Sequence, residues 1–329
     1  MIRCALAISH LPQQICGNDL PVRMIVSALA HINAHNQILV GSFGAIQFDL
    51  QLAEASRLNV PVELILTADF SIDQVKEVFP FLNIIAETTV SSHEERDLRL
   101  LSFAELIYVI WIRKNGRICK ILAGIEHQTQ IYQFDCSSFR FKSKSLQMTK
   151  GIRPVAQFPK EYLWHWTRTR NGVWPQESVE TYCRDILDSE CYPRSAVQTL
   201  KRIVAMNRII GSSESIGGGE VVVSFTENDP IQMSDHFVWR RGKHRMNFEP
   251  YAIGFPKSMM IDRGVVRVRY GETAAWDSME RADRWRSEKE WRVRGDFEFD
   301  SIKDLLIVIV RRECEKTLFD GFTVLVFDS

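Results

Sequence analysis

The sequence predicts two domains of different class, an α/β domain with a doubly wound parallel sheet followed by an α+β domain with a mixed or antiparallel sheet. Three observations predict this order. Strand and helix patterns alternate over the first 135 residues, a basic stretch without periodicity follows, and β-patterns dominate the remainder. A length of 329 residues also fits two domains better than one.

The first domain is assigned to residues 1–138 and is expected to be Rossmann-like. Its apolar runs predict buried strands, and segments with helical spacing predict helices between them. Asp19 stands before Pro21 as a candidate N-cap of the first helix. Strands are expected at 3–9, 37–45, 61–66 and 103–113, helices at 19–32, 46–59 and 71–82, and a closing hairpin at 118–124 and 129–134.

Residues 139–160 are assigned as a basic linker. Between Arg140 and Arg170 the chain has eight basic residues and one acid, Glu161, and a second basic cluster runs from Arg240 to Arg245. The net charge is zero, but residues 1–138 carry 10 basic and 14 acidic residues, so positive charge gathers in the rest of the chain. Such patches can contact phosphates, or they can be a solvated linker and loop.

The second domain is assigned to residues 161–329. It has few helical patterns, of which the amphipathic segment 194–209 is the clearest, and many short runs rich in β-branched and aromatic residues. Strands are expected at 162–169, 217–229, 248–256, 264–272, 287–295, 304–312 and 322–329.

The composition excludes several classes of protein. Hydrophobic residues make up 45% and charged residues 25%, which is typical of a folded chain. No apolar run is long enough to span a membrane, and the N-terminus lacks the pattern of a secretory signal. The seven cysteines form no Cys-x-x-Cys pair, which predicts no metal site, no disulfide framework and a cytoplasmic location. Cys183 and Cys191 are candidate nucleophiles, although no neighbour in the sequence is expected to lower the pKa of either thiol.

Glycines in the first domain mark a candidate phosphate site. Gly41, Ser42 and Gly44 lie where a predicted strand ends and a helix begins, and ligands of doubly wound sheets bind at such ends. Backbone N–H groups at a helix start suit an anion. The alternative is a tight strand-to-helix turn that needs glycine for its geometry alone.

Two carboxylates in the second domain are the candidate catalytic groups. If the segment 287–295 is a strand, Glu288, Glu290 and Arg292 share one face, while Trp291 and Val293 share the other. The Trp291 face is the better core face, so both carboxylates are expected to face a pocket. Paired carboxylates in a cleft can split their pKa values and act as acid and base. The alternative is a polar face salt-bridged by Arg292.

Other polar residues complete the candidate site. His165 on the 162–169 strand is either a ligand-binding hydrogen-bond donor or a satisfied core histidine, and Ser224 and Thr226 end an apolar strand where hydroxyls support a site or start a turn. The remaining candidate substrate-binding residues are Trp166, Thr167, Arg168, Tyr251 and Arg292.

The order of these motifs resembles a set of bacterial domains that includes the AbiGi-type abortive-infection proteins. The matching stretches are "HWT", "VSFTE", "YAIGF", "VRVRYGE" and "WRSEKEWR", over residues 162–295. The resemblance implies a role in phage defence or a mobile island rather than in metabolism. In the first domain, "EERDLRLLSFAELIYVI" resembles Rossmann-like nucleotide-binding domains of DNA-processing protein A and lysine-decarboxylase-like hydrolases, although their Pro-Gly-Gly-x-Gly-Thr loop is absent.

The same motif order is similar, more distantly, to that of ADP-ribosyltransferases. This likeness implies that His165, Ser224 with Thr226, and Glu288 with Glu290 bind NAD and transfer ADP-ribose, although "VSFTE" departs from the usual Ser-Thr-Ser element.

The two-domain plan also resembles the auxiliary proteins of bacterial 7-deazaguanine DNA-modification islands. This likeness implies hydration of 7-cyano-7-deazaguanine in DNA to its amide, without a cofactor, and partners among DNA, nucleotides and other island proteins. We take this hydration as the first hypothesis. NAD-dependent ADP-ribosyl transfer and a non-enzymatic nucleotide sensor are the alternatives.

Overall fold

The computed structural model describes residues 1–12, 14–125, 130–133, 158–214, 216, 219–240, 245–268 and 287–327. The chain forms two compact units, Met1–Ser143 with Gln176–Pro193, and Lys144–Pro175 with Arg194–Ser329. The segment Gln176–Pro193 therefore packs with the first unit, although its place in the sequence is in the second predicted domain. Most of the predicted linker, residues 139–157, lies outside the described residues.

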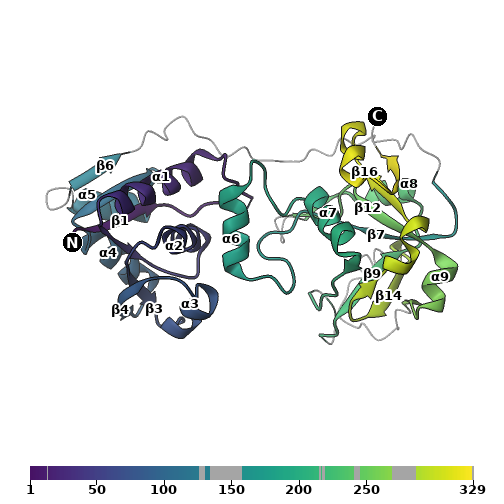
Figure 1. The fold of residues 1–329 in the computed structure, drawn as a ribbon, viewed down its shortest axis with the longest axis horizontal. Helices are drawn as coiled ribbons and strands as arrows, with labels where there is room; N and C mark the ends of the chain where they lie inside the picture. Colours follow the sequence, from purple (N-terminus) through teal and green to yellow (C-terminus); the bar gives the residue numbers. More distant parts are fainter. Residues whose placement is uncertain are drawn as a thin grey trace. The chain divides into compact units, whose positions relative to one another are not determined.

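The first unit contains the predicted doubly wound sheet (Figure 1). All its described pairings are parallel, and the strand order is β4-β3-β2-β1-β5-β6. The strands are β1 (Arg3–Ile8), β2 (Ile38–Gly41), β3 (Val62–Thr67), β4 (Ile84–Val90), β5 (Leu106–Trp111) and β6 (Gln130–Gln133). The parallel, Rossmann-like fold class predicted for this half is thus confirmed.

Helices connect these strands, and α5 (Arg117–Ile125) stands where the sequence predicted one strand of a hairpin. The others are α1 (Leu20–Ala34), α2 (Ile46–Leu58), α3 (Ile72–Val78) and α4 (His93–Ser102). The hairpin expected at 118–124 and 129–134 was wrong, because α5 covers the first segment and β6 pairs parallel to β5. Ile118, Ile121, Leu122 and Ile125 have helical spacing, and Leu122 is buried on the face that packs in the core.

Helix α2 of the first segment packs against α6 (Val179–Asp188) of the segment Gln176–Pro193. Every residue of α2 from Gln47 to Ser56 is buried. Asp49 of α2 accepts a hydrogen bond of 3.0 Å from the Gly44 amide. Burial raises the pKa of Asp49 to about 7, against the hydrogen bond from Gly44, which lowers it.

Replacing Asp49 with asparagine is therefore expected to stabilise the protein at high pH. The folded state holds a proton on Asp49 that the unfolded chain loses above pH 3.8, so the wild type loses stability as the pH rises from 3.8 through 7. Asparagine keeps the hydrogen-bond acceptor without this loss. Thermal unfolding should show equal stability at pH 4 and a gain of about 2–4 kcal/mol at pH 8. The exposed Asp73, changed to asparagine, should show no such pH-dependent gain; a flat difference for Asp49→Asn would contradict the expectation.

The second unit contains a mixed, mostly antiparallel sheet, as predicted (Figure 1). Its order is β13-β14-β9-β7-β12-β16-β17, and β16 and β17 alone of the described pairs are parallel. The strands are β7 (Tyr162–Trp166), β9 (Val222–Thr226), β12 (Ala252–Pro256), β13 (Val266–Arg267), β14 (Glu290–Arg294), β16 (Ile307–Val310) and β17 (Thr323–Val326). Two further pairs of short strands form outside this sheet, β8 (Arg208–Ile209) with β15 (Phe297–Glu298) and β10 (Trp239–Arg240) with β11 (Arg245–Met246). The helices of this unit are α7 (Ala196–Met206), α8 (Pro230–Met233) and α9 (Lys257–Asp262). No described helix is long and apolar enough to cross a membrane.

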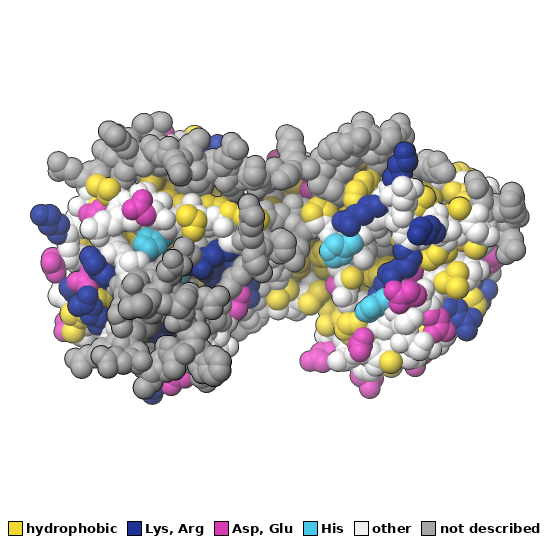
Figure 2. Space-filling view, turned by 180° about the vertical axis from the view of Figure 1, so that it is seen from behind, with side chains coloured by type: hydrophobic (Ala, Val, Ile, Leu, Met, Phe, Trp, Pro, Cys, Tyr) yellow, Lys and Arg dark blue, Asp and Glu magenta, His cyan; other side chains and the backbone are white. Residues whose placement is uncertain are grey.

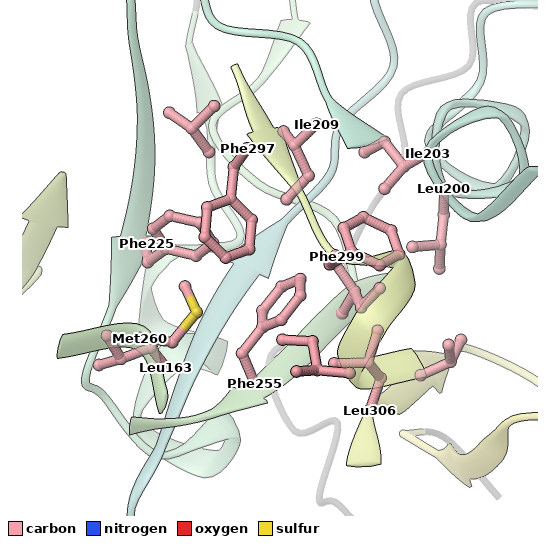
Figure 3. Close-up of a cluster of buried hydrophobic side chains, with 14 of the residues drawn as sticks. Leu163, Leu200, Ile203, Ile209, Phe225, Phe255, Met260, Phe297, Phe299 and Leu306 are labelled. Carbon is pink, nitrogen blue, oxygen red and sulfur yellow. The ribbon is translucent and has the colours of Figure 1, made fainter. Parts of the chain in front are cut away.

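One face of this sheet packs on α7 around a group of phenylalanines (Figure 3). The Phe255 ring lies 5.4–5.7 Å, centroid to centroid, from the rings of Phe225, Phe297 and Phe299, in edge-to-face arrangements. Trp291 and Val293 of β14 pack into the same cluster, so the face of that strand predicted to enter the core does so.

Two central strands of the sheet separate along their length. Strand β7 pairs with β12 over five residues and β9 pairs with β14 over five, but the register between β7 and β9 holds only Trp164 opposite Thr226. Beyond this pair the backbones of the two strands are not paired, and the Nδ1 atom of His165 donates across the gap to the Ser224 carbonyl at 2.9 Å. The gap positions the candidate site.

Candidate functional site

A cavity of about 820 Å³ lies at the gap between β7 and β9. Its volume is within the range of small-molecule and cofactor sites. Residues of both faces of the sheet line it, because the sheet is open at this point. On one side these include Trp166, Glu290 and Arg292, and on the other His165, Ile203 and Ile209.

The wall of the cavity has a surplus of positive charge. Its described residues include seven arginines and three glutamates, with no lysine or aspartate among them. The arginines are Arg168, Arg170, Arg202, Arg208, Arg240, Arg245 and Arg292, and the glutamates are Glu214, Glu288 and Glu290. Glu214 forms ion pairs of 3.0 Å with Arg245 and 3.1 Å with Arg170. Guanidinium groups at this density suit an anionic ligand such as phosphate.

The two predicted carboxylates both line this cavity, and their environments differ. Glu290 accepts two hydrogen bonds from Arg292, at 2.7 and 2.9 Å, and a third from the Ser224 hydroxyl at 2.8 Å. Glu288 precedes the strand and is mostly buried. Burial and the neighbouring Glu290 charge raise its pKa, while Arg240, a hydrogen bond from Asn247, and Arg168 act in the opposite direction. Glu288 is therefore the carboxyl that keeps a proton more readily than usual, and Glu290 is held by fixed donors.

His165 borders the cavity from the opposite face of the sheet. The register places Trp164, Thr226 and Glu290 on one face, and alternation along β7 puts His165 on the other, 5.9 Å from the Phe225 ring. Burial lowers the pKa of His165 to about 4, partly offset by its bond to Ser224, so the ring is neutral at neutral pH. A carbonyl can only accept, so Nδ1 carries the ring proton and Nε2 is an acceptor, for which the described residues provide no partner.

The remaining candidate residues divide between the cavity and the core. Trp166, Thr167, Arg168, Ser224, Thr226 and Arg292 line the cavity. Trp166 is 6% exposed, and its indole Nε1 is buried without a hydrogen-bond partner among the described residues. The Thr167 hydroxyl donates to the Ala196 and Tyr251 carbonyls. Tyr251 is not brought to the cavity, because it packs in the core and its hydroxyl donates to Glu315 at 3.0 Å.

The glycine loop of the first unit is closed by its own residues. The Gly44 amide donates to Asp49, and a side chain at Gly44 would meet the Phe70 ring. The Ser42 hydroxyl is buried without a partner among the described residues. In the nearby Arg-Asp element, Asp97 is buried and forms ion pairs of 2.7 Å with Arg96 and 2.6 Å with Arg117. Apart from the Ser42 hydroxyl, these polar groups are paired with one another within the unit.

Exposed basic side chains of the first unit lie where its strands end. Figure 2 shows Lys, Arg and His side chains gathered on one face of this unit. After β1, β4 and β5 the chain exposes His10, His93 and Arg113, and the Arg113 guanidinium donates to the His10 carbonyl at 3.3 Å. The carboxyl ends of parallel strands are where such sheets bind ligands.

The two candidate nucleophilic cysteines differ in their exposure. Cys183 is fully buried, and burial raises the pKa of its thiol well above the usual value, next to Asp49. Cys191 is exposed. Among the described residues, no group of three or more His, Cys, Asp or Glu side chains is arranged to hold a metal.

Sequence reasoning missed part of the cavity wall. Asn247, Glu214 and Arg170 come from loops, Arg202 from α7 and Arg208 from the two-residue strand β8. Their side-chain directions follow from tertiary packing rather than from alternation along a long strand. Arg240 and Arg245 were visible only as a basic cluster.

Comparisons of this chain with family models, curated proteins and solved structures found no match, so they assign neither unit to a family.

Proposed function

We propose that the second unit is an enzyme that hydrates the nitrile of 7-cyano-7-deazaguanine in DNA to the amide. The observation that carries the proposal is Glu288, a mostly buried carboxyl whose pKa is raised by burial and by the Glu290 charge, in an arginine-lined cavity large enough for a nucleotide. The arginines would bind the phosphate of the nucleotide, and Glu288 would donate a proton to the nitrile of its base.

The reaction needs one proton donor and one proton acceptor. Water adds its oxygen to the nitrile carbon, a proton reaches the nitrile nitrogen, and the resulting imidic acid rearranges to the amide. Glu288, whose raised pKa favours the protonated form more than in an ordinary carboxyl, is suited to donate to the nitrogen once it is protonated. The proton of the attacking water goes to His165 Nε2, which has no partner among the described residues, whereas Glu290 is held by Arg292 and Ser224. No redox group is required.

The apolar part of the cavity supports a base as ligand. Trp164, Trp166, Phe225 and Phe248 contribute to its wall beside the arginines. Trp166 contacts the rings of Phe237 and Phe327 edge-on at 5.3 and 6.0 Å, which fixes its indole in place. An enzyme that modifies a base within DNA must take the base out of the helix into such a pocket.

One observation favours a second candidate, ADP-ribosyl transfer from NAD. The hydrogen bond between Ser224 and Glu290 joins a hydroxyl of a middle strand to a carboxylate of a late strand, which are the elements that the transferase resemblance implies. Under this alternative, the carboxylate would stabilise the positively charged ribose that forms as nicotinamide leaves.

Mass spectrometry of nucleosides separates these functions. DNA containing 7-cyano-7-deazaguanine is incubated with the full-length protein and digested, and plain DNA is incubated with NAD and the protein in parallel. We expect the modified base to gain the mass of one water. An ADP-ribose adduct on DNA or protein would replace the proposal by the transferase, and no change in either reaction would leave the nucleotide sensor.

A further inference from the structure

Three guanidinium groups converge on one wall of the cavity. Arg168 follows β7, and Arg240 and Arg245 stand opposite each other in the β10–β11 ribbon. Residues directly opposite in an antiparallel pair project from the same face, and like charges in that position repel. The fold therefore holds three positive groups together at a cost in free energy.

The described residues neutralise this wall only in part. Arg245 is paired with Glu214. The Nε atom of Arg240 is buried without a partner, and Arg168 forms no hydrogen bond or ion pair within the described part of the chain. Burial, with the nearby Arg245 charge, lowers the pKa of Arg168 to about 10. Two guanidinium groups thus have donors available for a ligand.

The carboxyl of Glu288 lies within the field of the same two arginines. Arg240 and Arg168 both favour its ionised form, as does the hydrogen bond from Asn247, while Glu290 and burial favour the protonated form. The other charged groups lining this cavity near these elements are Glu214, Arg170, Arg245 and Arg292, and each has an ionic partner. The charge of Glu288 is consequently set by the balance between two unpaired arginines and one fixed carboxylate.

We propose that Arg168 and Arg240 form the phosphate subsite of this cavity, and that a phosphate bound between them causes Glu288 to take up a proton. The inference rests on the proposed function, for which it names the anchoring group and the event that prepares the acid. Guanidinium forks match phosphate oxygens in two-point hydrogen bonds. The bound anion opposes the field of the arginines at Glu288 and adds a negative charge nearby, and both effects favour the protonated carboxyl.

The proton comes from solvent, and binding and protonation are linked. One phosphate and at most one proton bind together, and the carboxylate of Glu288 becomes a carboxylic acid. Glu288 would then become a proton donor when the ligand arrives. The phosphate can belong to the DNA backbone or to a free nucleotide, because both offer the same oxygens.

Calorimetric titration of the full-length protein measures this linkage. The probes are sulfate, which mimics phosphate and does not titrate near neutral pH, and a thymidine dinucleotide, which has a single phosphodiester. Each titration is run in two buffers of different ionisation enthalpy, so that the difference in heat gives the number of protons taken up. We expect binding with net proton uptake for at least one probe. Uptake with the dinucleotide identifies a backbone phosphate, and uptake with sulfate alone identifies a terminal phosphate.

Single substitutions test whether the binding and the proton uptake depend on Arg168, Arg240 and Glu288. Arg168→Gln is expected to weaken binding at least tenfold, and Arg240→Gln gives the same test should the first variant not fold. Glu288→Gln is expected to bind at least as tightly as the wild type, but with no proton uptake. Arg294→Gln is the matched control, because Arg294 is exposed and lies outside the cavity.

Three outcomes would overturn the inference: no binding of either probe, binding without proton uptake by the wild type, or unchanged uptake by Glu288→Gln. The titration involves no chemistry on a base. A failure of nitrile hydration with linked binding intact would therefore remove the proposed function alone, and the reverse result would remove the subsite alone.

Discussion

Glu288→Gln is expected to lower the turnover of cyano-modified DNA by about 10²–10⁴-fold, the usual contribution of a positioned acid or base. Glutamine preserves the size of the side chain and can accept the hydrogen bond from Asn247, but it cannot deliver a proton to the nitrile nitrogen. Binding of the modified DNA should persist, because the arginines of the cavity remain. Nucleoside mass spectrometry at saturating DNA measures the rate.

The control for this variant is Glu298→Gln. Glu298 is exposed in β15 and does not line the cavity, so its replacement should leave the rate unchanged. Equal rates for wild type, Glu298→Gln and Glu288→Gln would remove Glu288 from the chemistry. A loss of DNA binding in Glu288→Gln would instead indicate that this carboxyl supports the pocket.

Phe255→Ala is expected to destabilise the second unit by about 3–5 kcal/mol, the range for deleting a buried phenylalanine ring. Phe255 is fully buried among the rings of Phe225, Phe297 and Phe299. Seven of the eight tryptophans lie in the second unit, with Trp111 in the first, so tryptophan fluorescence during urea unfolding reports mainly on this unit.

Ile231→Ala provides the comparison, because Ile231 is 53% exposed in the same unit. Its replacement should change the free energy of unfolding by no more than about 0.5 kcal/mol. If Phe255→Ala cost no more than Ile231→Ala, the phenylalanine cluster would not be the core of this unit.

The fold class was predictable because hydrophobic periodicity is local. Buried runs such as residues 3–9 and helical spacing such as 46–59 need no tertiary information, and both elements formed where expected. The edge strand β4 was missed because five of its seven residues are exposed, which removes the apolar signal. The prediction of a closing hairpin was wrong because a short apolar run is compatible with either a strand or a helix. In the folded protein, tertiary packing selects the helix α5.

The candidate site was predictable only along each strand. Alternation placed Glu290 and Arg292 together opposite the core face of β14, and the structure shows this arrangement. That His165 would reach the same cavity from the other face depends on the separation of β7 from β9, a property of strand pairing. Tyr251 could not be distinguished from a pocket residue, because its partner Glu315 is 64 residues away in the sequence.

Isotope incorporation can show whether this cavity adds water to a nitrile on a base. Cyano-modified DNA is incubated with the full-length protein in water enriched in heavy oxygen. The DNA is then digested to nucleosides, and the mass of the modified nucleoside is measured by mass spectrometry. We expect one heavy oxygen atom in the new amide, and slower formation of the amide in Glu288→Gln. A modified base that stays a nitrile after prolonged incubation with folded protein would contradict this expectation.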